Sequence, residues 1–251
     1  MSNKKPIISF TCAAIRDYRY RGCYDSLAKN SEVPFEVIFV GNKPPKETMP
    51  DNFKYIETNV KPAQCYEISV REATGDYVQL IADDEDFDDG YMNRLYKYTL
   101  LLDMDKVLIS ARLRLMVKPP EFIMIDAGCV FDAMATNAPF CGFAPLFRRD
   151  LWNKLGGIDK RFNGSLTDLD MQMRFYEYGL NPFITPDCIA SENNYYDIES
   201  RDDSLLVRTG DREGKFLRSL WTREDGTISK TRLSSVQSFV DNNILIENQG
   251  E

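Results

Sequence analysis

The fold is decided by one stretch, which reads Gly75-Asp76-Tyr77-Val78-Gln79-Leu80-Ile81-Ala82-Asp83-Asp84-Glu85-Asp86. A short apolar run rich in β-formers stands between a Gly-Asp turn and a cluster of carboxylates, which predicts a buried strand with acids at its carboxyl end. Open α/β sheets bind ligands outside the carboxyl ends of their strands. Carboxylates this close repel one another, and Mg²⁺ or Mn²⁺ relieves the repulsion because both ions prefer oxygen ligands. The stretch therefore predicts a site for a metal ion and a phosphate group.

These acids have two other interpretations. The acids could form a solvated loop whose last members cap the next helix, since Asp is common at helix starts. They could also form an EF-hand calcium loop counted from Asp84, but that loop needs Gly where Asp89 stands and Glu where Leu95 stands. The strand before the acids favours the metal site over the solvated loop.

The composition is that of a folded, acidic protein. Its 251 residues suffice for one large α/β domain with a C-terminal extension, and 43% hydrophobic residues can fill a substantial core. A net charge of −8 argues against nucleic acid as a partner, because a polyanion needs a surface rich in Lys and Arg. The chain has no histidine, which excludes Ser-His and Cys-His mechanisms and leaves carboxylates as the acid–base groups.

The cysteines and the apolar segments predict a cytoplasmic protein. The six cysteines have no C-x-x-C spacing, so neither a zinc site nor a dithiol motif is indicated, and their apolar surroundings are typical of reduced core residues. The start of the sequence shows no apolar signal segment. The longest uncharged stretch, residues 133–147, is too short to span a membrane and is interrupted by proline. We expect no transmembrane segment.

Strands and helices alternate along the first half of the chain. The pattern predicts strands at 7–12, 35–41, 54–57, 77–82 and 107–109, and helices at 18–28, 62–73 and 88–101. This alternation is typical of a Rossmann-like, mainly parallel sheet with helices on both faces. After residue 111 the pattern predicts short strands at 122–125 and 129–131, a short helix at 148–155 closed by two glycines, and a helix capped by Thr167 or Asp168.

Several motifs follow one another in a fixed order. The loop after the first strand reads Thr11-Cys12-Ala13-Ala14-Ile15-Arg16, and the adjacent acids Asp83-Asp84 follow the fourth strand. Further on stand Gly156-Gly157-Ile158-Asp159-Lys160-Arg161-Phe162 and then Thr167-Asp168-Leu169-Asp170, about eighty residues after the first acids. In this order, residues 5–195 resemble glycosyltransferase family 2, with its nucleotide-binding loop, its DXD-type motif, its Gly-Gly-Phe-Asp segment and its Glu-Asp catalytic pair.

The resemblance implies a fold, a reaction and a domain organisation. The fold would be the GT-A fold over residues 1–195, with a nucleotide-sugar half at 1–110 and an acceptor half at 111–195. Residues 196–251 would form a C-terminal arm or lid, with Arg201 or Arg208 closing over the diphosphate. The reaction would be inverting, metal-dependent transfer of a sugar from a nucleotide-sugar, most simply a UDP-sugar, to a hydroxyl of a glycan or lipid-linked acceptor. The cofactor would be Mn²⁺ or Mg²⁺.

The resemblance also implies roles for individual residues. Asp83 would hydrogen-bond the ribose or base side of the nucleotide, and Asp84 would bind the metal ion. Asp168 would be the general base that takes the proton from the acceptor hydroxyl. The nucleotide would be bound by the group Thr11, Ala13, Arg16, Asn42 and Asp83.

The sequence departs from the family pattern at four places. Thr167 replaces the Glu before the catalytic Asp, and Ala82 replaces an acid that often opens the metal motif. No histidine follows the last core strand, so we expect Glu192 or Asn193 to supply an oxygen ligand to the metal. Asn42 stands where an acid often recognises the base, and an amide suits uracil or guanine because it both donates and accepts.

Two other functions stay open, as does the acceptor site. A nucleotidyltransferase usually carries a glycine-rich loop after the first strand, and residues 11–17 contain no glycine. A non-catalytic module that binds nucleotide or glycan would share the fold without the reaction. For the acceptor, the aromatic and basic side chains of the irregular middle are candidates, namely Phe140, Phe143, Trp152 and Arg149. The sequence does not indicate an oligomeric state.

Overall fold

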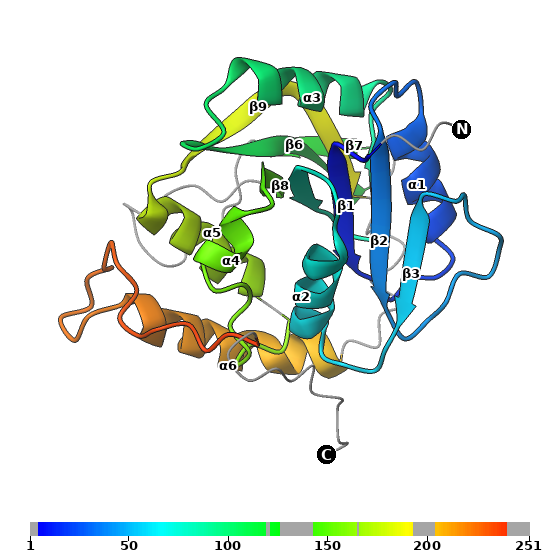
Figure 1. Cartoon of the computed structure of the whole chain (residues 1–251). Helices are drawn as coiled ribbons and strands as arrows, with labels where there is room; N and C mark the ends of the chain where they lie inside the picture. Colours follow the sequence, from blue (N-terminus) through cyan, green and yellow to red (C-terminus); the bar gives the residue numbers. More distant parts are fainter. Residues whose placement is uncertain (1–4, 119–120, 126–142, 165, 193–203, 240–251) are drawn as a thin grey trace.

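One nine-stranded sheet organises the molecule (Figure 1). The computed structural model describes residues 5–118, 121–125, 143–164, 166–192 and 204–239. Its strands are β1 (Ile8–Ala13), β2 (Phe35–Gly41), β3 (Phe53–Glu57), β4 (Tyr77–Leu80), β5 (Glu85–Phe87), β6 (Val107–Lys118), β7 (Glu121–Ile125), β8 (Phe143–Arg148) and β9 (Asn181–Glu192). Its helices are α1 (Tyr20–Ala28), α2 (Pro62–Glu72), α3 (Tyr91–Leu101), α4 (Leu151–Lys154), α5 (Thr167–Tyr178) and α6 (Ser204–Trp221).

The first half of the sheet is parallel, as the alternation of strands and helices predicts. The strands lie in the order β3-β2-β1-β4, and β1 pairs in parallel with both β2 and β4. The chain leaves β1 toward β2 on one side and returns to β4 on the other. The carboxyl ends of β1 and β4 are therefore a topological switch point, where sheets of this type bind their ligands.

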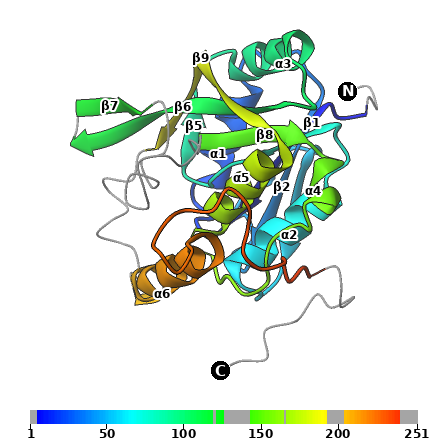
Figure 2. The ribbon, with the colours of Figure 1, turned by 90° about the vertical axis from the view of Figure 1, so that its left-hand side faces the viewer.

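The second half of the sheet is mixed. It continues in the order β8-β6-β9-β5, with β8 antiparallel to β4 and to β6, and with β9 parallel to β6. The predicted strand at 107–109 is the start of the much longer β6, which forms a hairpin with β7. Figure 2 shows this hairpin projecting beyond the rest of the sheet. The strand predicted at 129–131 lies outside the described residues.

The acids after β4 continue into a strand, which the sequence analysis did not predict. Residues Glu85 to Phe87 form β5, which pairs antiparallel with the end of β9. Glu85 and Phe87 are buried and Asp86 between them is half-buried, so the segment follows the two-residue period of a strand. The sequence shows no alternation of apolar and polar residues here, because one of the two buried positions holds a carboxylate.

Helices cover both faces of the sheet and enclose two apolar cores (Figure 1). On one face α1 and α3 contribute Tyr20, Leu27, Met92 and Leu95 to a core with the inner sides of β1 and β2. The other face is covered by α2, α4, α5 and α6. The GT-A-like layering that the sequence predicts is therefore present.

The C-terminal part of the chain contributes to this second core. Leu217, Leu220 and Trp221 of α6 are buried in it beside residues of α2 and α5, and Phe239 is buried there as well. The described part of the segment expected as an arm, residues 204–239, thus packs on the α/β domain (Figure 2). No helix in the described ranges is long and apolar enough to cross a membrane.

Two predicted helix boundaries were wrong. The helix expected at 148–155 is only α4, because Arg148 is the last residue of β8. The helix at Thr167 begins without a side-chain cap, because its N-cap residue is Leu166 at φ 60° and neither Thr167 nor Asp168 fills that role. The closing turn is as predicted, since Gly156 and Gly157 adopt φ angles of 81° and 65°.

Candidate functional site

The loop between β1 and α1 is held by Asp83, the first acid after β4. Its Oδ2 accepts hydrogen bonds of 2.6 Å from the backbone N–H groups of Ile15 and Arg16, and its Oδ1 accepts one from the Arg16 guanidinium. Asp83 is 1% exposed. Its carboxylate therefore shapes the loop that the sequence predicts to bind nucleotide.

Asp84 lies beside this loop and forms an ion pair with Arg16. Its Oδ2 is buried and makes no hydrogen bond within the described residues, and it lies 3.4 Å from Nη2 of Arg16. Burial raises the pKa of Asp84 to about 6, although Arg16 acts in the opposite direction. A second arginine, Arg19, donates to the Asp84 backbone oxygen at 3.3 Å and to Asp86 Oδ2 at 3.2 Å.

Two further carboxylates face each other across β5 and β9. Glu85 is the register partner of Glu192, so the two side chains leave the same face of the sheet. Burial raises the pKa of Glu85, and the charges of Glu192 and Asp84 raise it further. The Oε2 of Glu85 is buried without a hydrogen bond in the described part of the chain. Like charges placed directly opposite each other are destabilising, which makes this a place where a cation would be stabilised.

The donor set at this place suits Mg²⁺ or Mn²⁺. Of the two predicted ligands, Asp84 directly precedes β5 and Glu192 ends β9, and both raise the pKa of Glu85. Within the described ranges no three His, Cys, Asp or Glu side chains are grouped closely enough to hold a metal ion by themselves. Mg²⁺ is usually held by one or two carboxylates together with substrate phosphates and water, so a site of two carboxylates fits that pattern.

A pocket of about 460 Å³ opens at the carboxyl ends of the parallel strands. The ends of β1 and β2, the residues after β3 and the start of α2 form its walls. Its polar lining residues are Asn42, Thr58, Asn59, Lys61 and Asn163. Ala13 and Asn42 line it as the sequence predicts, and Arg16 follows the lining residue Ile15 directly. Thr11 lies elsewhere, because it is fully buried in β1 with its hydroxyl donating to the Gln79 carbonyl.

Gly41 closes the strand that forms one wall of this pocket. A Cβ added at Gly41 would lie 1.9 Å from the carbonyl oxygen of Ala14. The backbones of β2 and the loop after β1 are therefore too close for any side chain. Glycine is required here by the close approach of two chain segments.

Asp168 stands in the first turn of α5, in the part of the chain that the sequence predicts to bind the acceptor. Its side chain is exposed to solvent, yet the protein that surrounds it raises its pKa above the ordinary aspartate value. Hydrogen bonds from the Leu169 N–H and its own N–H act against this shift. A carboxylate that water can reach and whose basicity is raised has the properties of a general base.

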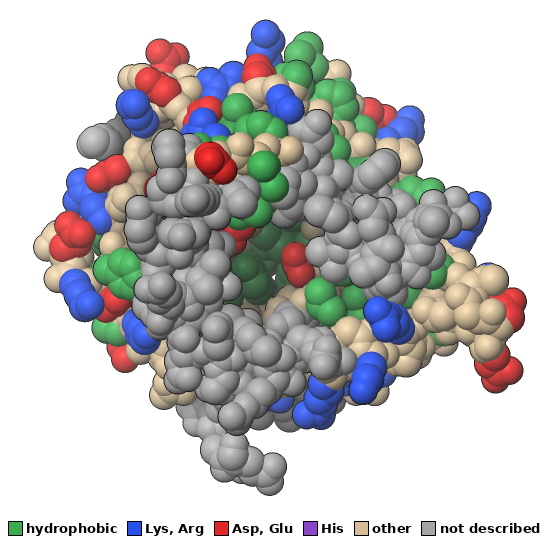
Figure 3. Space-filling model, turned by 180° about the vertical axis from the view of Figure 1, so that it is seen from behind, with side chains coloured by type: hydrophobic (Ala, Val, Ile, Leu, Met, Phe, Trp, Pro, Cys, Tyr) green, Lys and Arg blue, Asp and Glu red, His purple; other side chains and the backbone are tan. Residues whose placement is uncertain are grey.

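Tyr66 of α2 connects the two acidic motifs. Burial raises the pKa of its hydroxyl, and the charges of Asp168, Glu85 and Asp83 each raise it further. Acids from two segments that are far apart in the sequence therefore both affect this hydroxyl. The face of the molecule turned away in Figure 1 is hollowed, and acidic side chains are visible at the hollow in Figure 3.

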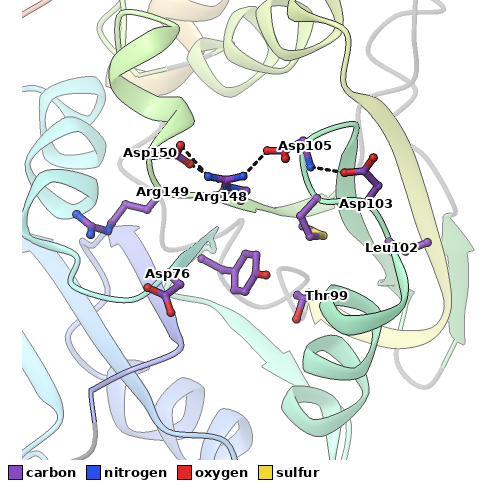
Figure 4. Close-up of a pocket in the computed structure, with 10 residues that line it drawn as sticks. Asp76, Thr99, Leu102, Asp103, Asp105, Arg148, Arg149 and Asp150 are labelled. Carbon is purple, nitrogen blue, oxygen red and sulfur yellow. Dashed lines mark hydrogen bonds and ion pairs between the residues drawn. The ribbon is translucent and has the colours of Figure 1, made fainter.

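Two of the candidates for an acceptor site, Trp152 and Arg149, lie away from these acids. Trp152 is 2% exposed, and its Nε1 donates to Glu67 in the core. Arg149 donates to the Gly75 carbonyl before β4 begins, and it lines a pocket of about 490 Å³ with Asp76, Asp103 and Asp150 (Figure 4). That pocket adjoins Tyr77, the first residue of β4, at the opposite end from Asp83. Phe140 lies outside the described residues.

Sequence reasoning missed Arg19, Tyr66 and Asn163. Arg19 follows Arg16 by three residues, so its place on the same loop could have been inferred from that spacing. Tyr66 is predicted to be helical, but its direction depends on how α2 packs. Asn163 comes from the segment before α5, and its backbone carbonyl accepts a hydrogen bond from the Ala63 N–H, which is a contact between distant segments.

Comparisons with known proteins agree with the fold. No model of a known protein family matches the chain, and no curated protein matches it. Among solved structures, a crystal structure of S. aureus TarS residues 1–349 has a TM-score of 0.57 at 14% identity, covering 77% of this chain and 62% of that one. The same TarS segment in complex with UDP-GlcNAc has a TM-score of 0.55 at 16% identity, covering 77% of this chain and 61% of that one. In complex with UDP it has a TM-score of 0.54 at 15% identity, covering 84% of this chain and 73% of that one.

The chain spans less than two thirds of the first of these structures and 36% of the longer TarS chain. Identity this low carries information on the fold alone. Together with the parallel half-sheet, its switch point and the helices on both faces, the similarity shows that this chain has a GT-A-like glycosyltransferase fold.

Proposed function

We propose that the protein is an inverting, metal-dependent glycosyltransferase of family 2 type that moves a sugar from a UDP-sugar to a hydroxyl of a glycan or lipid-linked acceptor. One observation carries this proposal. Asp84 has a buried oxygen without a hydrogen bond in the described residues, and Asp168 has a raised pKa. Asp168 and the acids next to Asp84 all raise the pKa of the Tyr66 hydroxyl, which supports one shared site.

The nucleotide would occupy the pocket at the ends of β1 and β2. The amides of Asn42 and Asn59 can both donate and accept, as the edge of uracil requires. TarS, whose fold is similar, has been crystallised with UDP and with UDP-GlcNAc, which supports a uridine nucleotide here. Asp83 would act mainly by holding the loop from Ala13 to Arg16 against the ligand.

The diphosphate would lie between this loop and the acids after β4. Asp84 and Glu192 would hold Mn²⁺ or Mg²⁺, which supplies positive charge to the leaving diphosphate when it is bound. Arg16 and Arg19 present guanidinium groups at the same place. Their charge would further stabilise the negative charge that develops on the leaving group.

The chemical step needs one base. Asp168 accepts the proton of the acceptor hydroxyl, and the oxygen forms a bond to the anomeric carbon from the face opposite the diphosphate. The bond between that carbon and the diphosphate oxygen breaks, and UDP leaves with the electron pair. One displacement inverts the configuration, so no covalent nucleophile is required.

The first test is a thermal-shift series with UDP, GDP, dTDP and CMP, each with Mn²⁺, Mg²⁺ or EDTA. A ligand that binds only the folded protein raises the melting temperature, by an amount that grows with its concentration relative to Kd. We expect a shift with UDP that EDTA abolishes. A shift with another nucleotide would change the donor, and no shift with any nucleotide would contradict the proposal.

A non-catalytic binding module is the second candidate. Thr167 stands where the family has Glu, and the Thr167 hydroxyl is buried without a hydrogen bond in the described residues. A binding module would give the UDP shift without turnover of a UDP-sugar. An assay of UDP-GlcNAc hydrolysis, measured as the UDP released, distinguishes an enzyme from a binding module, because only an enzyme releases UDP.

A further inference from the structure

The segment after α6 contacts the rest of the protein through the buried side chain of one arginine. Arg232 is 4% exposed and bridges two carboxylates that are almost completely buried. Its Nη2 donates to Asp159 Oδ2 at 2.6 Å, and its Nε donates to Asp170 Oδ1 at 3.0 Å. One planar guanidinium therefore joins the Gly-Gly-Ile-Asp segment to helix α5.

Asp170 is in the first turn of α5, two residues after Asp168. It also accepts hydrogen bonds of 2.9 Å from Trp221 Nε1, at the end of α6, and from Arg174 Nε, one turn further along α5. Asp170 is buried while Asp168 is exposed, so the first turn of α5 is held on its inner side and presents Asp168 on its outer side.

Local sequence does little to fix this turn. The N-cap residue Leu166 makes no side-chain hydrogen bond and adopts φ 60°, which is unfavourable for a residue with a side chain. The segment before it is also held from α6, because Glu213 accepts hydrogen bonds from the N–H groups of Asn163 and Gly164. The start of α5 thus depends on partners that lie beyond residue 210.

We infer that Arg232 is a positioning residue, which braces the first turn of α5 and so fixes the Asp168 carboxylate in the site. The effect on catalysis rests on the proposed function of Asp168, whereas the bracing of α5 does not. Its physical basis is that a buried carboxylate with several charged donors has one favoured position, and moving it costs several hydrogen bonds at once.

The variant that tests this is Arg232→Lys. Lysine keeps the positive charge but presents a single ammonium in place of the guanidinium fork, so it cannot reproduce both contacts in the same geometry. The matched control is Arg161→Lys, because Arg161 bonds the same Asp159 but its other hydrogen bond goes to the Ser235 carbonyl. A distant control is Arg148→Lys, whose partners Asp105 and Asp150 lie at the pocket in Figure 4.

Two readouts are needed. Hydrogen exchange of the amides of residues 167–171 reports on the first turn directly, and we expect faster exchange in Arg232→Lys only. Turnover of UDP-GlcNAc should fall by about 10- to 100-fold in that variant, because a displacement of about 1 Å can cost this much. UDP affinity should stay unchanged, since the nucleotide pocket lies on β1, β2 and α2.

The inference would be overturned if the amides of this turn exchanged at the wild-type rate in Arg232→Lys, or if that variant had wild-type turnover. If the wild-type protein turns over no UDP-sugar, the proposed function fails, while the exchange result still decides whether Arg232 braces α5. Should Arg232→Lys not fold, Asp170→Asn removes the same charged contact from the other side. It should loosen the same turn, and normal exchange there would again contradict the inference.

Discussion

At the scale of the single residue, the chemistry depends on how each carboxylate is used. Asp83 has both oxygens bonded within the protein, Asp84 keeps one buried oxygen unbonded among the described residues, and Asp168 is open to water. The residue type is the same in all three, so the surroundings decide the role. The sequence located all three acids, and the family resemblance implied a role for each, but neither showed which carboxylate oxygens the protein itself binds.

Replacing Asp168 with Asn should abolish proton transfer and keep the nucleotide site intact. General base catalysis contributes about 10²- to 10⁴-fold, so kcat for UDP-GlcNAc should fall within that range. UDP affinity, measured by calorimetry, should be that of the wild type. The exposed Asp225, which lies in the turn after α6, offers the control substitution Asp225→Asn. Equal kcat in wild type and Asp168→Asn would leave Asp168 without a catalytic role.

Gly41→Ala should damage the nucleotide pocket. The added Cβ meets the Ala14 carbonyl at 1.9 Å, so β2 and the loop after β1 must separate, at a cost of about 1–3 kcal/mol of unfolding free energy. UDP binding should weaken with it. The control is Gly22→Ala in α1, where a Cβ meets nothing within 4 Å and where alanine should stabilise the helix by about 0.5–1 kcal/mol. Equal UDP affinity in Gly41→Ala and wild type would show that the wall of the pocket is elsewhere.

At the scale of the element, the strands and helices of the first half were predictable and those of the second half less so. β1, β2, α2 and β4 each have a clear period and local end signals, such as Pro62 at the start of α2. β5 and the start of α5 lack such signals, because pairing with β9 and contacts from α6 define them. The site has the same limit: Asp83, Asp84 and Asp168 follow from motifs, whereas Arg19 and Tyr66 follow from packing.

The buried link between Asp159 and Arg232 predicts a specific pH dependence. Burial opposes the charge of Asp159, but hydrogen bonds from Arg161 and Arg232 outweigh it and lower its pKa to about 2. An acid whose pKa is lower in the folded state stabilises the fold above its unfolded pKa, near 4, and this stability is lost as the pH falls toward 2. At neutral pH the contribution is about 2.5 kcal/mol.

Asp159→Asn should therefore lower the unfolding free energy about twice as much at pH 7 as at pH 3. Urea titrations at both values measure the difference. The exposed Asp103 has a lowered pKa from Lys106 and gives the control Asp103→Asn, which should have little effect at either pH. An Asp159→Asn effect that does not shrink on acidification would show that the charge of Asp159 is not what stabilises the fold.

At the scale of the whole molecule, the α/β domain and the segment after it share one core. Leu217, Leu220, Trp221 and Phe239 are buried among residues of α2 and α5. A sequence boundary near residue 195 is reasonable from composition, since the chain becomes polar there. Composition does not reveal that an amphipathic helix beyond it completes the apolar core.

A chain that ends at residue 203 should not fold stably. Each buried apolar side chain of this size contributes about 2–5 kcal/mol, so losing four exceeds much of the 5–15 kcal/mol that holds a typical domain together. We expect the shortened protein to lose its cooperative unfolding transition and to be insoluble or to bind ANS. A shortened chain with a sharp transition and wild-type UDP affinity would instead identify residues 204–239 as a separate appendage.

The bridge made by Arg232 also sets an order of events during synthesis. Its partners Asp170 and Asp159 precede it by 62 and 73 residues. At about 5–20 residues per second, roughly 3–15 seconds pass between the synthesis of α5 and that of its arginine. During this interval Asp159 has Arg161 and Asp170 has Arg174, but the guanidinium that joins the two acids has not yet been made. The first turn of α5 can therefore reach its final arrangement only after Arg232 has been made.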